Sequence, residues 1–231
     1  RCGAEKGPIS SRGGGGGDAG ETKSRRGNLV KLRLDGNELG SLGDSTFSGL
    51  PNLLYLHLES NRIRWLSRGA FTGLAKLRFL DLSGNQQSSL RHPDIFGPLR
   101  SLHTLLLASN GLQQLTGGLF QHLPGLAKLS LSGNRLAHLA PDAFTGLGSL
   151  KELRLEGNLL SHLPVALLEP LSSLEALDLS RNAWLSIGEG LAWAPRSRSL
   201  EVESCSAVGA FSCGIARSPL RRWHRFLRNR H

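Results

Sequence analysis

The chain has 231 residues, of which 39% are hydrophobic and 20% charged, a balance typical of a protein with a folded core. Its formal net charge of +10 would suggest a nucleic-acid partner, but the charge is unevenly placed. Residues 29–182 carry 14 basic against 12 acidic side chains, whereas the flanks 1–28 and 183–231 contribute +3 and +5. Basic charge indicates polyanion binding when it gathers on a folded face. We therefore expect no nucleic-acid partner.

The first 28 residues are predicted to form a disordered, glycine-rich basic tail. Gly13–Gly17 is a low-complexity run, and no Gly-Lys-Ser/Thr sequence follows it, as a phosphate-binding loop would require. The segment that begins at Arg1 lacks the apolar stretch of a secretory signal peptide. No apolar run elsewhere approaches the ~18–20 residues of a membrane-spanning helix. The sequence therefore predicts neither an export signal nor a membrane anchor.

From residue 29 to residue 182, a unit of 24 or 25 residues recurs about seven times. Each unit opens with a leucine and has further leucines three and five positions later and an asparagine eight positions later. The opening leucines are Leu29, Leu53, Leu77, Leu102, Leu126, Leu150 and Leu174. The asparagines are Asn37, Asn61, Asn85, Asn110, Asn134, Asn158 and Asn182. The regular register predicts that residues 29–182 form one repeat array.

This pattern has the spacing and the length of leucine-rich repeats. The alternation in Leu32, Arg33 and Leu34 predicts a short strand with leucines on one face. One unit cannot bury its leucines alone, whereas stacked units form a parallel sheet over a continuous core. We therefore expect an α/β-type solenoid, a leucine-rich repeat horseshoe with short parallel strands on its concave face. Each asparagine is expected to bond backbone groups in neighbouring turns.

The third and seventh units depart from the repeat. The third has Gln87 where other units carry leucine or isoleucine, and one extra residue before Phe96, which predicts a local bulge around residues 88–93. The seventh begins at Leu174 and fades after Asn182. Neither end has a recognisable cap, and we expect both ends to fray because an open end exposes the core.

Residues 183–231 are predicted to form an irregular basic tail. Within it, a serine-proline pair begins a candidate helix at 218–230 with Leu220, Trp223 and Phe226 on one face and arginines around it. Such a helix would make weak contact with anionic membranes. A tail without structure is the competing interpretation.

The array resembles the extracellular leucine-rich repeat proteins of vertebrates. The phrases that carry the resemblance include NLVKLRLDGNELGSL, NLLYLHLESNRIRWL, FQHLPGL and LRLEGNLLSHLPVALLEPLSSLEALDLS, which begin at Asn28, Asn52, Phe120 and Leu153. The resemblance is greatest to members that accompany Toll-like receptors. It implies an extracellular or cell-surface protein of innate immunity, in the response to lipopolysaccharide, with a Toll-like receptor complex as its protein partner.

The outward positions of the predicted strands supply the candidate binding residues. Two positions after each opening leucine stand Tyr55 and Phe79, and four positions after it stand His57, Asp81 and Leu106. Tyr55, Phe79 and Leu106 should form an apolar island edged by His57 and Asp81, and Arg33 precedes them in the same row. Apolar clusters rimmed by polar groups often mark protein contacts. Ordinary surface exposure is the competing explanation.

A second outward cluster consists of Lys128, Lys151, Glu152, Arg154 and Glu156. Its charges alternate in sign along and across the strands. We interpret it as a solvated face of cross-strand ion pairs, each of which contributes little to stability.

The sequence does not indicate an enzyme, a metal site or a small-molecule cofactor. His57 and Asp81 are expected to be neighbours, but no serine or cysteine of recognisable context accompanies them. The cysteines Cys2, Cys205 and Cys213 lack zinc spacing, and at least one is unpaired within the chain. Two further functions remain open: polyanion or membrane-surface binding through the basic tails, and a structural role in the extracellular matrix.

Overall fold

The computed structural model describes residues 27–164, 166–183 and 201–203. The predicted tails 1–28 and 183–231 lie largely outside these ranges, as do the candidate helix 218–230 and its membrane contact. All three cysteines lie outside them as well.

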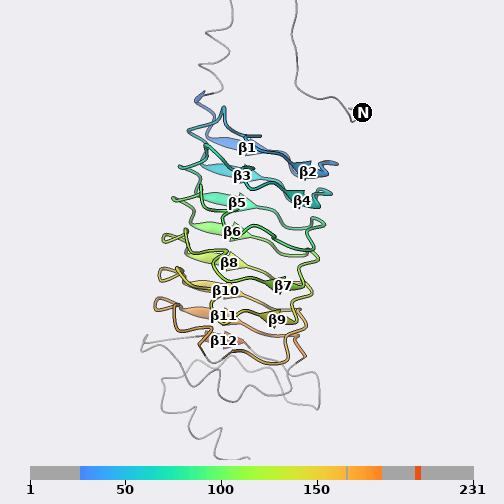
Figure 1. Cartoon of the computed structure of the whole chain (residues 1–231), viewed down its shortest axis with the longest axis vertical. Helices are drawn as coiled ribbons and strands as arrows, with labels where there is room; N and C mark the ends of the chain where they lie inside the picture. The colour runs from blue at the N-terminus through green and yellow to red at the C-terminus, as the bar shows by residue number, and fades with distance from the viewer. Residues whose placement is uncertain (1–26, 165, 184–200, 204–231) are drawn as a thin grey trace, which may run out of the picture.

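Eight three-residue strands stack in chain order along one side of a coil (Figure 1). All of them pair in parallel with their neighbours. The strands are β1 (Lys31–Arg33), β3 (Tyr55–His57), β5 (Phe79–Asp81), β6 (Thr104–Leu106), β8 (Lys128–Ser130), β10 (Glu152–Arg154), β11 (Ala176–Asp178) and β12 (Glu201–Glu203). This is the parallel-strand solenoid that the repeat predicts.

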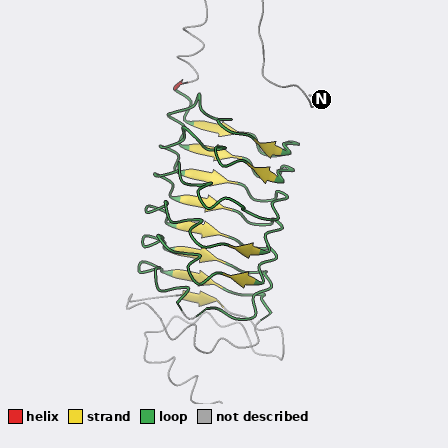
Figure 2. Cartoon of the chain, in the orientation of Figure 1, coloured by secondary structure: helices red, strands yellow, loops and turns green. Residues whose placement is uncertain are grey.

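Two smaller sheets lie across the coil from the main sheet. They pair β2 (Ser41–Leu42) with β4 (Trp65–Leu66), and β7 (Gln114–Leu115) with β9 (His138–Leu139). Turns and loops, drawn green in Figure 2, connect the strands of each unit across residues 28–164 and 166–183.

The leucines of the repeat form one continuous core beneath the main sheet. The central leucine of each strand from β3 to β11 is at most 1% exposed, and the flanking leucines are equally buried. Opposite the sheet, Phe71, Phe96, Phe120 and Phe144 stack with ring centroids 6.0, 6.1 and 6.4 Å apart. Burying one such side chain contributes roughly 1.5–3 kcal/mol, so each interior unit of the stack adds to stability in the same way.

From Asn61 onward, the asparagines connect each turn to the one before it, as the sequence predicts. Asn37 bonds only within its own unit among the described residues. The side-chain amide of Asn110 donates to the carbonyl oxygen of Leu82 in the preceding unit at 3.0 Å and to that of Leu107 in its own unit at 3.2 Å. Its side-chain oxygen accepts the N–H of Gln87 at 3.1 Å. The same three contacts recur at Asn61 and Asn134.

The third unit interrupts the smaller sheets and leaves the main sheet intact. No strand forms on that side between β4 and β7 among the described residues, whereas β5 and β6 pair normally in the main sheet. Gln87 is 1% exposed, and its amide donates to the carbonyl oxygen of Ile63 at 3.2 Å. Gln87 therefore occupies a position that is apolar in other units, and its side-chain amide still has a hydrogen-bond partner.

The two ends of the stack differ in burial. At the β1 end Leu29, Leu32, Leu34, Leu39 and Leu50 are only partly buried. At the other end Leu177 is 1% exposed, and β12 pairs with β11. β12 lies beyond the predicted array, within the segment 183–231 that was expected to be an irregular tail. Val202 nevertheless follows Leu177 by 25 residues, a spacing that the array already uses.

Candidate binding surface

The outward side chains of the main sheet form three rows across the strands. Side chains alternate between the two faces of a strand, so the residues two, four and six positions after each opening leucine point away from the core. The register places Tyr55 beside Phe79 in the first row, and His57 beside Asp81 in the second. Strands β3 and β5 therefore supply the centre of the predicted island.

Three ring side chains meet at this centre. The ring centroids of Tyr55 and Phe79 lie 6.3 Å apart, and those of His57 and Phe79 lie 4.9 Å apart with an interplanar angle of 38°. Tyr55 is 41% exposed, which is unusual for a large apolar side chain in this fold. We call Tyr55, His57 and Phe79 the aromatic patch.

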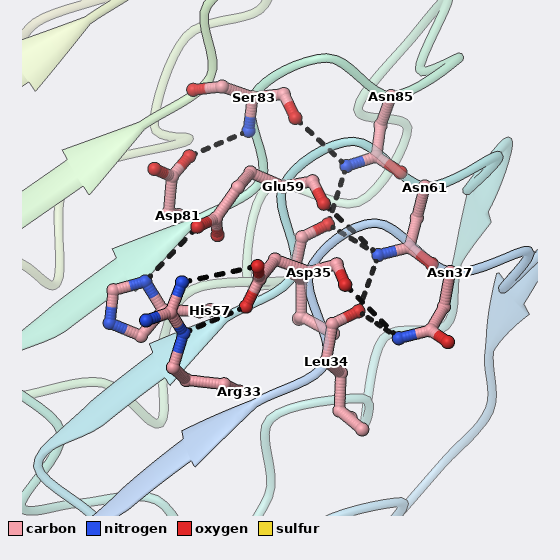
Figure 3. Close-up of polar contacts among 11 residues, drawn as sticks. Arg33, Leu34, Asp35, Asn37, His57, Glu59, Asn61, Asp81, Ser83 and Asn85 are labelled. Atoms are coloured by element: carbon pink, nitrogen blue, oxygen red, sulfur yellow. Dashed lines mark hydrogen bonds and ion pairs between the residues drawn. The ribbon is translucent and has the colours of Figure 1, made fainter.

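The remaining predicted residues border the aromatic patch. Leu106 lies beside Asp81 in the second row and is half-buried, while Thr104 is the residue beside Phe79. A carboxylate oxygen of Asp81 accepts the backbone N–H of Ser83 at 2.8 Å (Figure 3). Asp81 lies beside His57 in register, as expected for neighbours, but it makes no hydrogen bond with His57 among the described residues.

His57 bonds instead to a residue that is missing from the predicted set. Its Nδ1 lies 3.3 Å from Oε1 of Glu59, and Figure 3 shows the two side chains facing one another. The other carboxylate oxygen of Glu59 is buried and has no hydrogen-bond partner among the described residues. Glu59 stands in the third outward row, and reading that row in the sequence would have identified it.

Arg33 is engaged within its own unit. Its Nε and one terminal nitrogen donate to the two carboxylate oxygens of Asp35 at 3.0 and 3.2 Å (Figure 3). The hydrogen bond from Arg33 holds the pKa of Asp35 below its ordinary value. Arg33 lies beside His57 in register. Its charge, however, is neutralised by Asp35 of its own unit.

The second outward cluster consists of cross-strand ion pairs, as predicted. Lys128 on β8 lies 2.9 Å from one carboxylate oxygen of Glu152 on β10, and Arg154 bonds the other. Burial opposes ionisation of Glu152, but the bonds from Lys128 and Arg154 outweigh it and hold its pKa below the ordinary value. Lys151 pairs with Glu175 at 3.0 Å, so the cluster presents little unpaired charge.

An open groove lies away from the main sheet, in the segments after β2 and β4. Asp44, Arg68, Asp94, Arg100 and His122 line it. Arg68 pairs with Asp94 at 2.8 Å, and His122 lies 3.7 Å from the same carboxyl group. Arg68 and Asp94 are thus paired within the groove, and a carboxylate oxygen of Asp44 accepts the backbone N–H of Gly69 at 2.8 Å.

Within the described ranges, no group of three or more histidine, cysteine, aspartate or glutamate side chains is arranged to hold a metal ion. The same ranges contain no helix that is long and apolar enough to cross a membrane.

Two sequence profiles, both described as leucine rich repeat, match the chain. One covers residues 27–86 and 100–160, and the other covers residues 76–99. The chain belongs to the leucine-rich repeat family. No curated protein sequence matches it significantly.

Among solved structures, this leucine-rich repeat protein is similar to the ectodomain-type arrays of Toll-like receptors. A structure of a TLR13–ssRNA13 complex is 30% identical, with a TM-score of 0.71 over 76% of this chain and 24% of that chain. The Toll–Spatzle complex of Drosophila is 26% identical, with a TM-score of 0.60 over 76% of this chain and 26% of that chain. The repeat array therefore spans about a quarter of the length of each of these proteins.

Proposed function

We propose that the chain is a non-enzymatic protein-binding scaffold of innate immunity that acts outside the cell or at its surface. The aromatic patch is the observation that carries the proposal. The patch places three rings on the face of the main sheet that points away from the core, and Tyr55 is 41% exposed there. Exposed aromatic side chains with a polar rim are typical anchors of protein interfaces.

A Toll-like receptor complex is the partner that we propose. Two observations support it: the likeness of the array to TLR13 and Toll, and the resemblance of its repeat phrases to the Toll-like receptor 4 interactor with leucine-rich repeats. Repeat arrays of this family generally bind partners and do not catalyse reactions, which agrees with a surface built from aromatic and acidic side chains.

The test measures binding of the full chain to the Toll-like receptor 4 ectodomain by surface plasmon resonance. Replacing both Tyr55 and Phe79 with alanine should weaken binding at least about ten-fold, because buried aromatic anchors supply most of the energy of such interfaces. Trp65→Ala is the matched control, since Trp65 is 50% exposed but lies on β4, outside the main sheet. Equal affinity of the double variant and the unmodified chain, with unchanged circular dichroism, would contradict the proposal.

Salt dependence separates this function from binding through the basic tails. Binding through the aromatic patch should change little with ionic strength. Tail-driven binding to a polyanion should fall steeply with added salt, because the release of counterions on binding then contributes less free energy. A steep loss of affinity between low and physiological salt would favour the tails.

A further inference from the structure

The acidic side chains of the main sheet differ in whether a basic side chain accompanies them. Asp35 is paired with Arg33 at 3.0 Å. Glu152 is paired with both Lys128 and Arg154. Glu59 faces only the imidazole of His57, and Asp81 forms no ion pair among the described residues. Neither Glu59 nor Asp81 thus forms an ion pair with a lysine or arginine among the described residues.

The same sheet carries an equivalent group of residues in units six and seven. We call this group the second place and use it for comparison. Glu156 and Asp178 occupy the same positions in units six and seven that Glu59 and Asp81 occupy in units two and three. Arg154 stands there in the position of His57, and it lies beside Asp178 in register. A hydrogen bond from Arg154 to Glu152 is the main reason why the pKa of Arg154 is raised, and the charges of Glu156 and Asp178 raise it further.

The aromatic patch has the two equivalent carboxyl groups, Glu59 and Asp81, but it has no guanidinium group at the position that corresponds to Arg154. The imidazole of His57 replaces it, and an imidazole is not a permanent cation. One oxygen of Glu59 is buried without a hydrogen-bond partner among the described residues, and so is one oxygen of Glu156 at the second place. The two places differ in the residue two positions earlier, which is His57 before Glu59 and Arg154 before Glu156. A donor that reaches the carboxyl group of Glu59 would lower its free energy. Tyr55 stands at the position of Glu152 in the second place, and Phe79 stands at the position of Ala176, so the second place has no aromatic ring at either position.

Lys31 and Arg33 are the basic residues of β1 next to the patch, and neither forms an ion pair with Glu59 or Asp81 among the described residues. Arg33 holds Asp35 through two hydrogen bonds, and Figure 3 shows its guanidinium turned toward that carboxyl group. Glu59 is the smallest of the contributions that raise the pKa of Arg33. The charges of Arg33 and Asp35 cancel. Glu59 and Asp81 then stand against the single charge of Lys31, which lies beside Tyr55 in register, so the formal balance around the patch is negative by one.

We propose that the aromatic patch binds an arginine side chain of the protein partner. The guanidinium lies over the rings of Phe79 and Tyr55, and the carboxylates of Glu59 and Asp81 pair with its N–H groups. A planar guanidinium both stacks on aromatic rings and forms paired hydrogen bonds with carboxylates, which an ammonium group does less well. This inference rests on the proposed protein-binding function and adds the chemistry of the residue that is recognised.

The single tyrosine of the sequence provides the reporter for the test. The full chain is prepared with 3-fluorotyrosine, so that one fluorine resonance reports on Tyr55. The probes are an acetylated leucine–arginine–leucine amide and the same peptide with citrulline, which keeps the shape of arginine but carries no charge. We expect a saturable shift with the arginine peptide and affinity for the citrulline peptide about ten-fold lower.

Two double variants test which carboxylates are responsible. Glu59→Gln with Asp81→Asn should abolish the preference for arginine over citrulline. Glu156→Gln with Asp178→Asn removes the equivalent carboxylates of the second place and should leave the preference unchanged. Equal shifts with both peptides, the absence of any shift, or equal effects of the two double variants would each overturn the inference.

An anionic ligand is the opposite outcome. If a single-stranded RNA oligonucleotide shifts the Tyr55 resonance at lower concentration than the arginine peptide, the patch does not recognise a cation. The proposed function is judged separately by receptor binding of the Tyr55 and Phe79 double variant. Loss of receptor binding without any preference for arginine would retain the function and reject only this inference.

Discussion

The side chain of Asn110 satisfies backbone groups in two successive turns of the coil. It donates to carbonyl oxygens of both units and accepts the buried N–H of Gln87. Short strands of three residues leave many backbone groups outside the sheet ladders, and buried groups without partners are costly. The asparagine is thus a structural residue, and its regular recurrence in the sequence reports on the fold and not on a binding site.

Asn110→Ala should lower the free energy of unfolding by roughly 2–4 kcal/mol, because it leaves buried donors and acceptors unpaired. Asn37→Ala should cost a small fraction of that, since Asn37 is exposed and, among the described residues, donates only to Leu34 and Asp35 of its own unit. Urea unfolding followed by circular dichroism measures both. Equal losses for the two variants would show that the contacts between turns are unimportant.

At the scale of single elements, β8 and β10 are joined by ion pairs as well as by the sheet ladder. Lys128 and Arg154 hold the pKa of Glu152 below its ordinary value of 4.5 against the effect of burial. A carboxyl group whose pKa is depressed by folding stabilises the protein above its ordinary pKa, and that stabilisation is lost as the pH falls through the folded-state pKa.

Glu152→Gln should therefore reduce stability at pH 7 by roughly 0.2–1 kcal/mol, in the range of partly exposed ion pairs. The difference from the unmodified chain should shrink as the pH falls below 4.5. Thermal unfolding across this pH range provides the measurement. Glu175→Gln is the control with a smaller expected effect, because Glu175 and Lys151 are 60% and 59% exposed. A difference that stays constant from pH 7 to pH 3 would refute this explanation.

At the scale of the whole molecule, the stack is unequal at its two ends. β1 pairs only with β3 among the described residues, and the leucines of the first unit are partly exposed. At the other end, β12 extends the main sheet beyond β11, and Leu177 is 1% exposed. A repeat array gains its stability from contacts between neighbouring units, so the unit with one neighbour is the weakest.

Leu129→Ala should destabilise the fold by about 2–5 kcal/mol, because Leu129 is fully buried in the middle of the stack. Leu32→Ala, at the equivalent position of β1, should cost less than half as much. Urea unfolding gives the two losses, and amide hydrogen exchange should show faster exchange in the first unit than in β8. Equal losses would indicate that β1 is as well covered as the interior strands.

The sequence by itself determined the repeat and what repetition implies. Leucine spacing fixed the strand positions and the core, and the asparagine positions predicted the contacts between turns, because both depend on residues within one or two units. The outward rows also predicted that Tyr55, His57 and Phe79 would meet, since parallel strands in register bring equivalent positions together. The repeat pattern did not predict the strand β12, because only one position of that unit, Val202, matches the repeat.

Only the tertiary structure decided how the outward polar side chains are paired. His57 bonds Glu59 and not Asp81, and Arg33 turns to Asp35 in its own unit. These choices depend on side-chain rotamers and on which carboxyl group lies within a few ångströms, which spacing along the chain does not specify. They leave Glu59 and Asp81, beside the aromatic patch, without an ion pair to lysine or arginine among the described residues, and the proposed arginine recognition follows from that arrangement.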